Sequence, residues 1–237
     1  MKREYYKLRS SRLGREMELV VFGHAGLPVL VFPTSGGRFF DFEDRGMVAE
    51  VAGKIEAGRL RLCCVDSVDQ ESWYNRRAHP RRRVARQVEY ERYVLDEVVP
   101  LMRDGSGAEN GLTALGISFG GYHAVNIALR HPDVFTGVIS LSGAFELEPF
   151  LGGYYDQDCY YNLPTHYLPN LTDPWYLDRI RQGRYVLATG RDDQCLSQNR
   201  NLHAILESMG IPHRFDVWDA ENSHDWPTWR LMAAEYL

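Results

Sequence analysis

The sequence predicts an α/β fold in which helices cover both faces of a mostly parallel sheet. Short β-branched runs alternate with longer segments of helical periodicity, and no internal repeat or low-complexity linker divides the 237 residues. Strands that are joined through helices pair in parallel by right-handed crossovers. Because 44% of the residues are hydrophobic and the length suits one core, we expect a single domain, residues 1–237.

The expected strands are short apolar runs bounded by turn residues. The first two flank Leu13-Gly14 and should form an antiparallel pair. The strands are Tyr5–Arg9, Glu16–Phe22, Val29–Phe32, Leu60–Val65, Leu112–Ile117, Val134–Ser140, Tyr185–Thr189 and Phe215–Trp218. The helices expected between and after them are Gly46–Ile55, Pro80 to about Arg103, Gly120–Arg130, Leu196–Ser208 and Trp226–Leu237.

One segment, at about 144–182, interrupts this alternation because it shows no clear periodicity. Long irregular segments inside compact domains are usually functional loops. The segment is rich in aromatic residues, so we expect either a wall that binds the acyl or alcohol part of a substrate, or a loop whose rings only pack onto the sheet. These rings belong to Phe150, Tyr154, Tyr155, Tyr160, Tyr161, Tyr167, Trp175 and Tyr176.

Composition excludes several classes of protein. The net charge of −5 argues against nucleic-acid binding, and the arginines between Arg76 and Arg86 are expected at a solvated helix start or, alternatively, at an anion or acidic-partner site. Leu19–Phe32 is too short and interrupted to cross a membrane. The polar N-terminus lacks a signal-peptide pattern, so we expect a cytoplasmic protein. The four cysteines, Cys63, Cys64, Cys159 and Cys195, have no metal-site spacing and are expected to be buried thiols.

A candidate nucleophile, Ser118, lies in Gly116-Ile117-Ser118-Phe119-Gly120. This motif follows a predicted strand and opens a predicted helix, which is the setting of a nucleophile elbow. The turn holds the serine in a strained backbone, and side chains at Gly116 or Gly120 would collide with neighbouring backbone. The alternative is a serine that only caps the helix.

A serine hydroxyl needs a histidine to take its proton and a carboxylate to orient that histidine. On such a sheet the acid follows the serine in the chain and the histidine comes last. Asp192 and Asp193 follow a predicted strand, and we prefer Asp193. His224 lies between the last strand and the last helix, whereas the other histidines fall in a helix, at the start of a strand, in or before turns, or in the irregular segment.

The oxyanion that forms during acyl transfer needs two backbone N–H donors. The amide of Phe119 follows the nucleophile. The second donor is expected in the glycine-rich loop 33–38, with Ser35 preferred and Thr34 or Gly36 as alternatives.

With these motifs, the sequence resembles the putative-esterase family of α/β-hydrolases, which includes S-formylglutathione hydrolases, feruloyl and acetyl xylan esterases and mycolyltransferases. The resemblance rests on residues 32–38, on 116–124 and on Ser223-His224-Asp225-Trp226-Pro227. It implies an α/β-hydrolase fold and a Ser-Asp/Glu-His triad, with no metal and no organic cofactor. Ser118 and His224 match the motif positions directly, and Asp193 matches less closely.

We therefore expect a serine carboxylesterase that acts on a small or medium ester. The alternatives are an acyltransferase with the same triad and a binding protein on the same fold. The sequence leaves a homo-oligomer open and does not identify the substrate.

Overall fold

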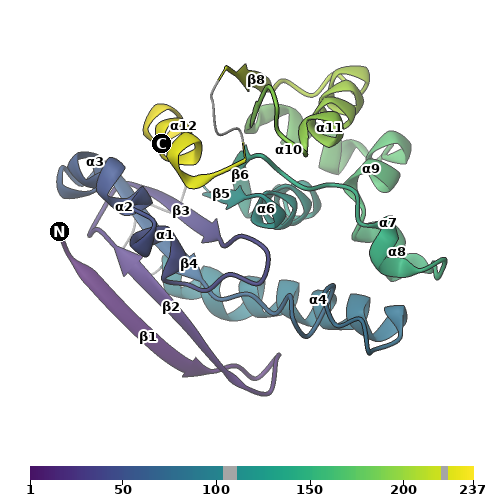
Figure 1. The fold of residues 1–237 in the computed structure, drawn as a ribbon, viewed down its shortest axis with the longest axis horizontal. Helices are drawn as coiled ribbons and strands as arrows, with labels where there is room; N and C mark the ends of the chain where they lie inside the picture. The colour runs from purple at the N-terminus through teal and green to yellow at the C-terminus, as the bar shows by residue number, and fades with distance from the viewer. Residues whose placement is uncertain (104–110, 220–223) are drawn as a thin grey trace.

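The computed structural model has an eight-stranded sheet at its centre (Figure 1). It describes residues 1–103, 111–219 and 224–237. The strand order is β1-β2-β4-β3-β5-β6-β7-β8; β1–β2 and β2–β4 pair antiparallel, and the other neighbours pair in parallel. The strands are β1 (Arg3–Arg9), β2 (Glu16–Phe22), β3 (Leu27–Phe32), β4 (Leu60–Val65), β5 (Leu112–Ile117), β6 (Phe135–Leu141), β7 (Arg184–Gly190) and β8 (Arg214–Trp218).

Helices cover both faces of this sheet and form two separate apolar cores. One core contains residues of α4 (Pro80–Tyr93), α6 (Phe119–Arg130), α10 (Pro174–Gln182) and α11 (Leu196–Ser208). The other contains residues of α1 (Asp41–Asp44), α2 (Met47–Glu50), α3 (Ala52–Glu56) and α12 (Trp226–Tyr236). The predicted α/β class is thus confirmed.

The strand sequences divide between the two cores because successive side chains of a strand point to opposite faces. In β3, Leu30 and Phe32 enter the first core, whereas Val29 and Val31 enter the second. The neighbouring strand β4 sends Cys63 to the first core and Cys64 to the second. Parallel strands that are buried on both faces therefore appear in the sequence as continuous apolar runs, not as alternating ones.

The segment expected to be irregular contains helices. They are α7 (Glu148–Leu151), α8 (Gln157–Tyr161), α9 (Pro164–Tyr167), a 3₁₀ turn (Leu168–Asn170) and α10. Capping residues define them: Asp156 and Asp173 accept hydrogen bonds from helical N–H groups, and prolines occupy the first turns of α7, α9 and α10. α7, α8 and α9 have only four or five residues each, too few to show an apolar periodicity, and the nine-residue α10 buries Ile180 alone, which explains why the prediction missed them.

Two predicted helices also have internal breaks. The long helix from Pro80 continues through a π-helical segment (Val94–Val98) into α5 (Val99–Arg103). The helix expected at Gly46–Ile55 is divided into α2 and α3 at Val51. Both stretches remain helical in the regions that the patterns indicated.

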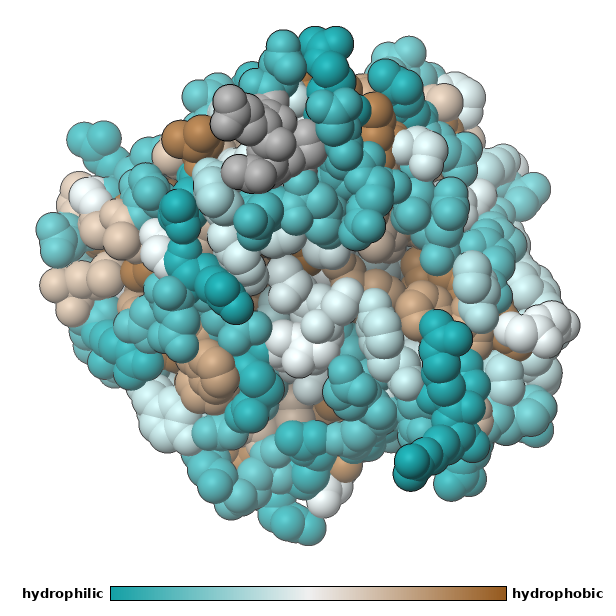
Figure 2. All heavy atoms as spheres, in the orientation of Figure 1, coloured by the Kyte–Doolittle hydropathy of each residue, from teal (hydrophilic) through white to brown (hydrophobic). Residues whose placement is uncertain are grey.

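The carboxyl ends of all six parallel-paired strands, β3 to β8, lie at one edge of the sheet, where α/β proteins place their binding sites. The residues that follow these strands are loop 33–38 after β3, Asp66–Asp69 after β4, Ser118 after β5, Ser142 after β6, Asp193 after β7 and His224 after β8. No helix within the described residues is long and apolar enough to cross a membrane. Hydrophilic residues cover most of the face shown in Figure 2.

Candidate active site

Ser118 occupies a sharp turn between β5 and α6. Its φ of 55° and ψ of −119° are unfavourable for a residue with a side chain, and the neighbouring backbone is closely packed. A Cβ atom at Gly116 would lie 1.8 Å from the Gly120 carbonyl oxygen, and one at Gly120 would lie 2.3 Å from the Pro33 carbonyl oxygen. The two glycines are therefore required by this turn, as the motif predicted.

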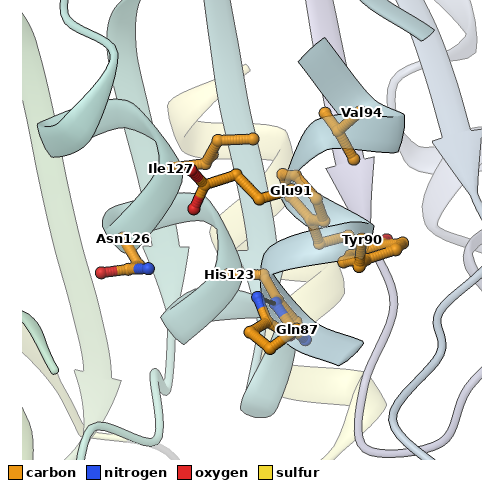
Figure 3. A pocket seen from close by; sticks show the side chains of 8 residues that line it. Gln87, Tyr90, Glu91, Val94, His123, Asn126 and Ile127 are labelled. Carbon is orange, nitrogen blue, oxygen red and sulfur yellow. Dashed lines mark hydrogen bonds between the residues drawn. The ribbon is translucent and has the colours of Figure 1, made fainter. Parts of the chain in front are cut away.

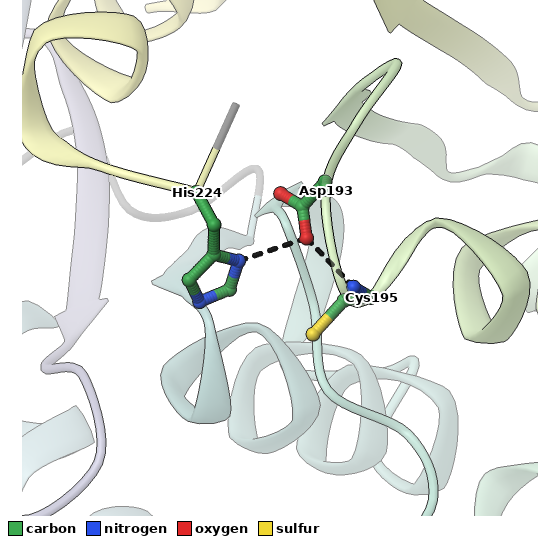
Figure 4. Close-up of side chains that lie close together, drawn as sticks. All are labelled: Asp193, Cys195 and His224. Carbon is green, nitrogen blue, oxygen red and sulfur yellow. Dashed lines mark hydrogen bonds and ion pairs between the residues drawn. The ribbon is translucent and has the colours of Figure 1, made fainter. Parts of the chain in front are cut away.

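His224 lies between Ser118 and Asp193. Its Nε2 is 3.1 Å from Ser118 Oγ. Its Nδ1 is 2.8 Å from Asp193 Oδ1, the contact that Figure 4 shows. The side chain of His224 is 21% exposed, whereas that of Asp193 is completely buried. The structure thus brings together the three side chains that the sequence analysis selected, although they are separated by long stretches of chain.

Of the two candidate acids, Asp193 is the one that contacts the imidazole through Oδ1, and Asp192 is exposed. Burial alone would raise the pKa of Asp193, but hydrogen bonding by His224, the Ser142 hydroxyl and the Cys195 amide lowers this pKa overall. The carboxylate is thereby kept ionised, which suits a group that orients an imidazole and stabilises its protonated form.

Two residues that the sequence analysis did not select support this arrangement. The indole N–H of Trp229 donates a hydrogen bond of 2.9 Å to Ser142 Oγ, and the Trp229 ring packs edge-on against His224 at 5.0 Å. Ser142 also has an unusual backbone, with φ at 53°. A polar residue directly after β6, at the same edge as Ser118, was the available signal.

Loop 33–38 lies beside the nucleophile turn, and its amides narrow the choice of the second oxyanion donor. The N–H of Gly36 donates to Asp69 Oδ2 at 3.0 Å, and that of Gly37 donates to the Thr34 carbonyl at 2.8 Å. The amide of Gly36, one of the three predicted donors, is therefore already engaged in a hydrogen bond to Asp69. Among the described residues, the amides of Thr34, Ser35 and Phe119 make no hydrogen bond within the protein and are left as the candidate donors.

The aromatic segment contributes less to the site than its composition indicated. Phe150 packs against Phe119 at 6.0 Å and against Tyr74 at 5.0 Å, and Tyr74 packs on Phe119 at 5.2 Å. Tyr161, Tyr167 and Tyr176 instead line a depression beside Leu129, Arg130 and His131, at the opposite end of α6 from Ser118. Of the two alternatives expected for this segment, packing of the rings fits Tyr161, Tyr167 and Tyr176, whereas the Phe150 ring is the one that packs against Phe119 beside the nucleophile.

The arginines between Arg76 and Arg86 lie around the start of α4, as expected, and some bind within the protein. Arg83 donates to the carbonyls of Ala78 and Phe150, and Arg86 pairs with Glu71 and Glu89.

Within residues 1–103, 111–219 and 224–237, two clusters contain potential metal ligands within 4.8 Å of one another: Asp193, Cys195 and His224, and His203, Glu207 and His213. In the first cluster, both ring nitrogens of His224 already face Asp193 and Ser118. Burial raises the pKa of Cys195 to about 12, so its thiol is protonated at neutral pH. In the second cluster the two imidazoles are hydrogen-bonded to each other at 2.7 Å.

The sequence pattern of the family described as "Putative esterase" matches residues 10–235. The chain belongs to this family. The resemblance deduced from the sequence motifs is therefore confirmed.

Relatives of this esterase-family chain include the acetyl esterase of Caldicellulosiruptor saccharolyticus, which is 28% identical over 135 residues. The aligned part spans half of this chain and half of that enzyme. A ferulic acid esterase structure matches with a TM-score of 0.79 at 17% identity, covering all of this chain and 96% of the other. An S-formylglutathione hydrolase from Agrobacterium tumefaciens matches with a TM-score of 0.76 at 15% identity, covering 99% and 92% of the two chains. These structures establish the shared α/β-hydrolase fold.

Proposed function

We propose that this protein is a serine carboxylesterase with Ser118 as nucleophile, His224 as general base and acid, and Asp193 as the group that orients His224. The observation that carries the proposal is the chain of contacts from Ser118 Oγ through His224 to Asp193, at 3.1 and 2.8 Å, on a strained turn. A serine that only capped a helix would need neither the histidine nor the strain. Membership of the esterase family supports the same conclusion.

In the proposed reaction, His224 Nε2 accepts the hydroxyl proton while Ser118 Oγ forms a bond to the ester carbonyl carbon. The carbonyl oxygen becomes an oxyanion, which the N–H of Phe119 and that of Ser35 or Thr34 would stabilise. The intermediate then expels the alcohol, which receives the proton from His224. In the second half of the reaction His224 accepts a proton from water while the water oxygen attacks the acyl carbonyl carbon. The intermediate then expels Ser118 Oγ, which receives that proton from His224, and the carboxylic acid is released. These steps need no metal or organic cofactor.

Hydrolysis is favoured over transfer of the acyl group to another acceptor, because the family match and the acetyl esterase relative both indicate ester cleavage. Phe119, Tyr74 and Phe150 form a compact aromatic cluster beside the nucleophile. We propose a small or medium ester as the substrate, with acetyl esters the first to test. We also propose a cytoplasmic location, since all four cysteines are free, as is usual in a reducing compartment.

The direct test is Ser118→Ala, assayed with p-nitrophenyl esters of short and long acyl chains and with an acetylated sugar. We expect hydrolysis to fall by about 10⁴-fold or more, and labelling by a fluorophosphonate probe to disappear. Product analysis with added alcohols, amines and thiols separates hydrolysis from acyl transfer. A Ser118→Ala protein that matches the wild-type rate would refute the assignment.

A further inference from the structure

A second buried carboxylate, Asp69, lies at the same sheet edge but outside the triad. It is 0% exposed, and each of its oxygens has a different partner. Oδ1 lies 2.9 Å from Nε2 of His123 on helix α6, and Oδ2 accepts the N–H of Gly36 at 3.0 Å. One carboxylate thus joins the loop after β3 to the helix that begins at the nucleophile.

The proton in this contact can be placed from Asp69, because a carboxylate oxygen only accepts and Nε2 of His123 must therefore donate. The side-chain nitrogen of Gln87 lies 3.3 Å from His123 Nδ1, and this contact is a hydrogen bond when Nδ1 is the accepting nitrogen. Figure 3 shows Gln87 and His123 next to each other at a cavity of about 10 Å³ between α4 and α6. The Gln87 oxygen has no partner among the described residues.

His123 and Asp69 have no direct part in proton transfer to a substrate. The His123 side chain is only 2% exposed, and both of its ring nitrogens already have partners within the protein. The ring instead stacks on Phe32 at 5.8 Å and packs edge-on against Phe119 at 5.2 Å. Phe32 precedes the loop that carries Thr34 and Ser35, and Phe119 supplies the other oxyanion donor.

We propose that Asp69 is a positioning residue that fixes the two halves of the oxyanion hole relative to each other. Through Gly36 it holds the loop with the second donor, and through His123 it holds the start of α6 with the first donor. Hydrogen-bond donors stabilise an oxyanion only when they are fixed at its position before the charge develops. The inference rests on the proposed esterase activity.

The test is Asp69→Ala, with kinetics measured on a p-nitrophenyl ester. Removal of one oxyanion donor typically lowers kcat by about 10²- to 10³-fold, and a donor that is only less well fixed should lower kcat by less. We therefore expect kcat of Asp69→Ala to fall by about 10- to 100-fold, with KM changed by less than about 3-fold. Affinity for a trifluoromethyl ketone, which forms a tetrahedral oxyanion adduct with serine, should fall by the same factor as kcat/KM.

The conservative variant Asp69→Asn gives a sharper readout. Its amide oxygen can accept from Gly36 while its NH₂ donates to His123 Nε2, provided that the His123 proton moves to Nδ1 and the Gln87 amide rotates to offer its oxygen. We therefore expect Asp69→Asn to retain at least about a third of the wild-type kcat. Gln87→Met alone should also be close to wild type, whereas the double variant should resemble Asp69→Ala.

Glu91→Gln is the matched control. Glu91 is a buried carboxylate that contacts His131 Nε2 at 2.9 Å and Arg130, at the other end of α6. Its loss should lower the Tm but leave kcat/KM within about 2-fold, because it does not contact loop 33–38.

Each outcome has a distinct meaning. Wild-type kcat and ketone affinity in Asp69→Ala, in an enzyme whose Ser118→Ala variant is inactive, would overturn the positioning role. The positioning role would also be overturned if the losses of activity in Asp69→Ala and Glu91→Gln were both proportional to their decreases in Tm. If Asp69→Ala does not fold, Asp69→Asn and its combination with Gln87→Met decide the matter, and equal activities in these two would overturn the proposal. An active Ser118→Ala protein would instead refute the proposed function.

Discussion

Two carboxylate–imidazole pairs at the same sheet edge, Asp193–His224 and Asp69–His123, have nearly the same geometry but different surroundings. Their N···O distances are 2.8 and 2.9 Å, and both carboxylates are fully buried. The side chain of His224 is 21% exposed and its other nitrogen faces Ser118, whereas that of His123 is 2% exposed and its other nitrogen faces Gln87. We infer from this difference that the third partner and the access to solvent decide whether a carboxylate–imidazole pair can transfer protons or only position other groups.

The largest contrast is expected between the two histidines. His224→Ala removes the proposed base, so kcat should fall by about 10⁴-fold or more. In His123→Gln, kcat should fall by no more than about 100-fold, because this change disturbs only the position of the oxyanion donors. Steady-state kinetics on one ester, with Tm values for both variants, measures the difference. Comparable losses in two folded variants would remove the distinction between the pairs.

The next contrast is between the two acids. Asp193→Asn leaves the His224 ring beside an amide that favours the wrong tautomer, and we expect kcat to fall by about 10⁴-fold. Asp69→Asn should retain at least about a third of the wild-type kcat, because its amide can replace both hydrogen bonds of the carboxylate. The two proteins differ from wild type by the same chemical change, so their kcat ratio reports directly on the role of each carboxylate. A kcat ratio near one between Asp193→Asn and Asp69→Asn would contradict the different roles proposed for the two carboxylates.

The Asp193 substitution also predicts a dependence of stability on pH. The pKa of Asp193 is lowered in the folded protein, so its contribution to stability is complete above the unfolded-state value of about 3.9 and is lost as the pH falls through the folded pKa. The difference in unfolding free energy between wild type and Asp193→Asn should therefore shrink below about pH 4. Urea unfolding at pH 7, 5 and 3.5 measures it. A difference that grows in acid would mean that the carboxylate is not stabilised by its partners.

The smallest effect is expected at Tyr74, whose hydroxyl donates to Ser35 Oγ at 2.8 Å. Tyr74→Phe keeps the ring against Phe119 and removes one hydrogen bond to a side chain, not to the donor amide. We expect kcat/KM to change by less than about 5-fold and stability by about 1 kcal/mol. A loss as large as that of Asp69→Ala would show that the Ser35 side chain, more than the Gly36 amide, fixes the loop.

The sequence predicted the part of the site that has local signatures. The elbow at Ser118 combines a strand, two required glycines and a helix within a few residues, and chain order then selected Asp193 and His224. The strands were predicted almost residue by residue because parallel strands buried on both faces form distinct apolar runs.

The contacts that could not be predicted from the sequence join residues that share no motif. Asp69, Gly36 and His123 come from three separate strand–loop units, and only the tertiary fold shows that one carboxylate serves both. His123 lies within the elbow motif itself, yet nothing in that motif indicates whether its ring is buried. Asp66 and Asp69 directly after β4 were the one available signal, since acids at that edge lie near the nucleophile.

The four free cysteines are all buried, and their pKa values are raised by burial, to about 12 for Cys63 and Cys195 and about 11 for Cys159. Alkylating reagents react with thiolates and not with thiols, so we expect the cysteines of the folded protein to react very slowly with maleimides. A single cysteine introduced at an exposed position such as Tyr155 would therefore carry a fluorophore or spin label alone, in an otherwise unaltered chain. Site-specific spectroscopy of this enzyme can begin from its natural sequence.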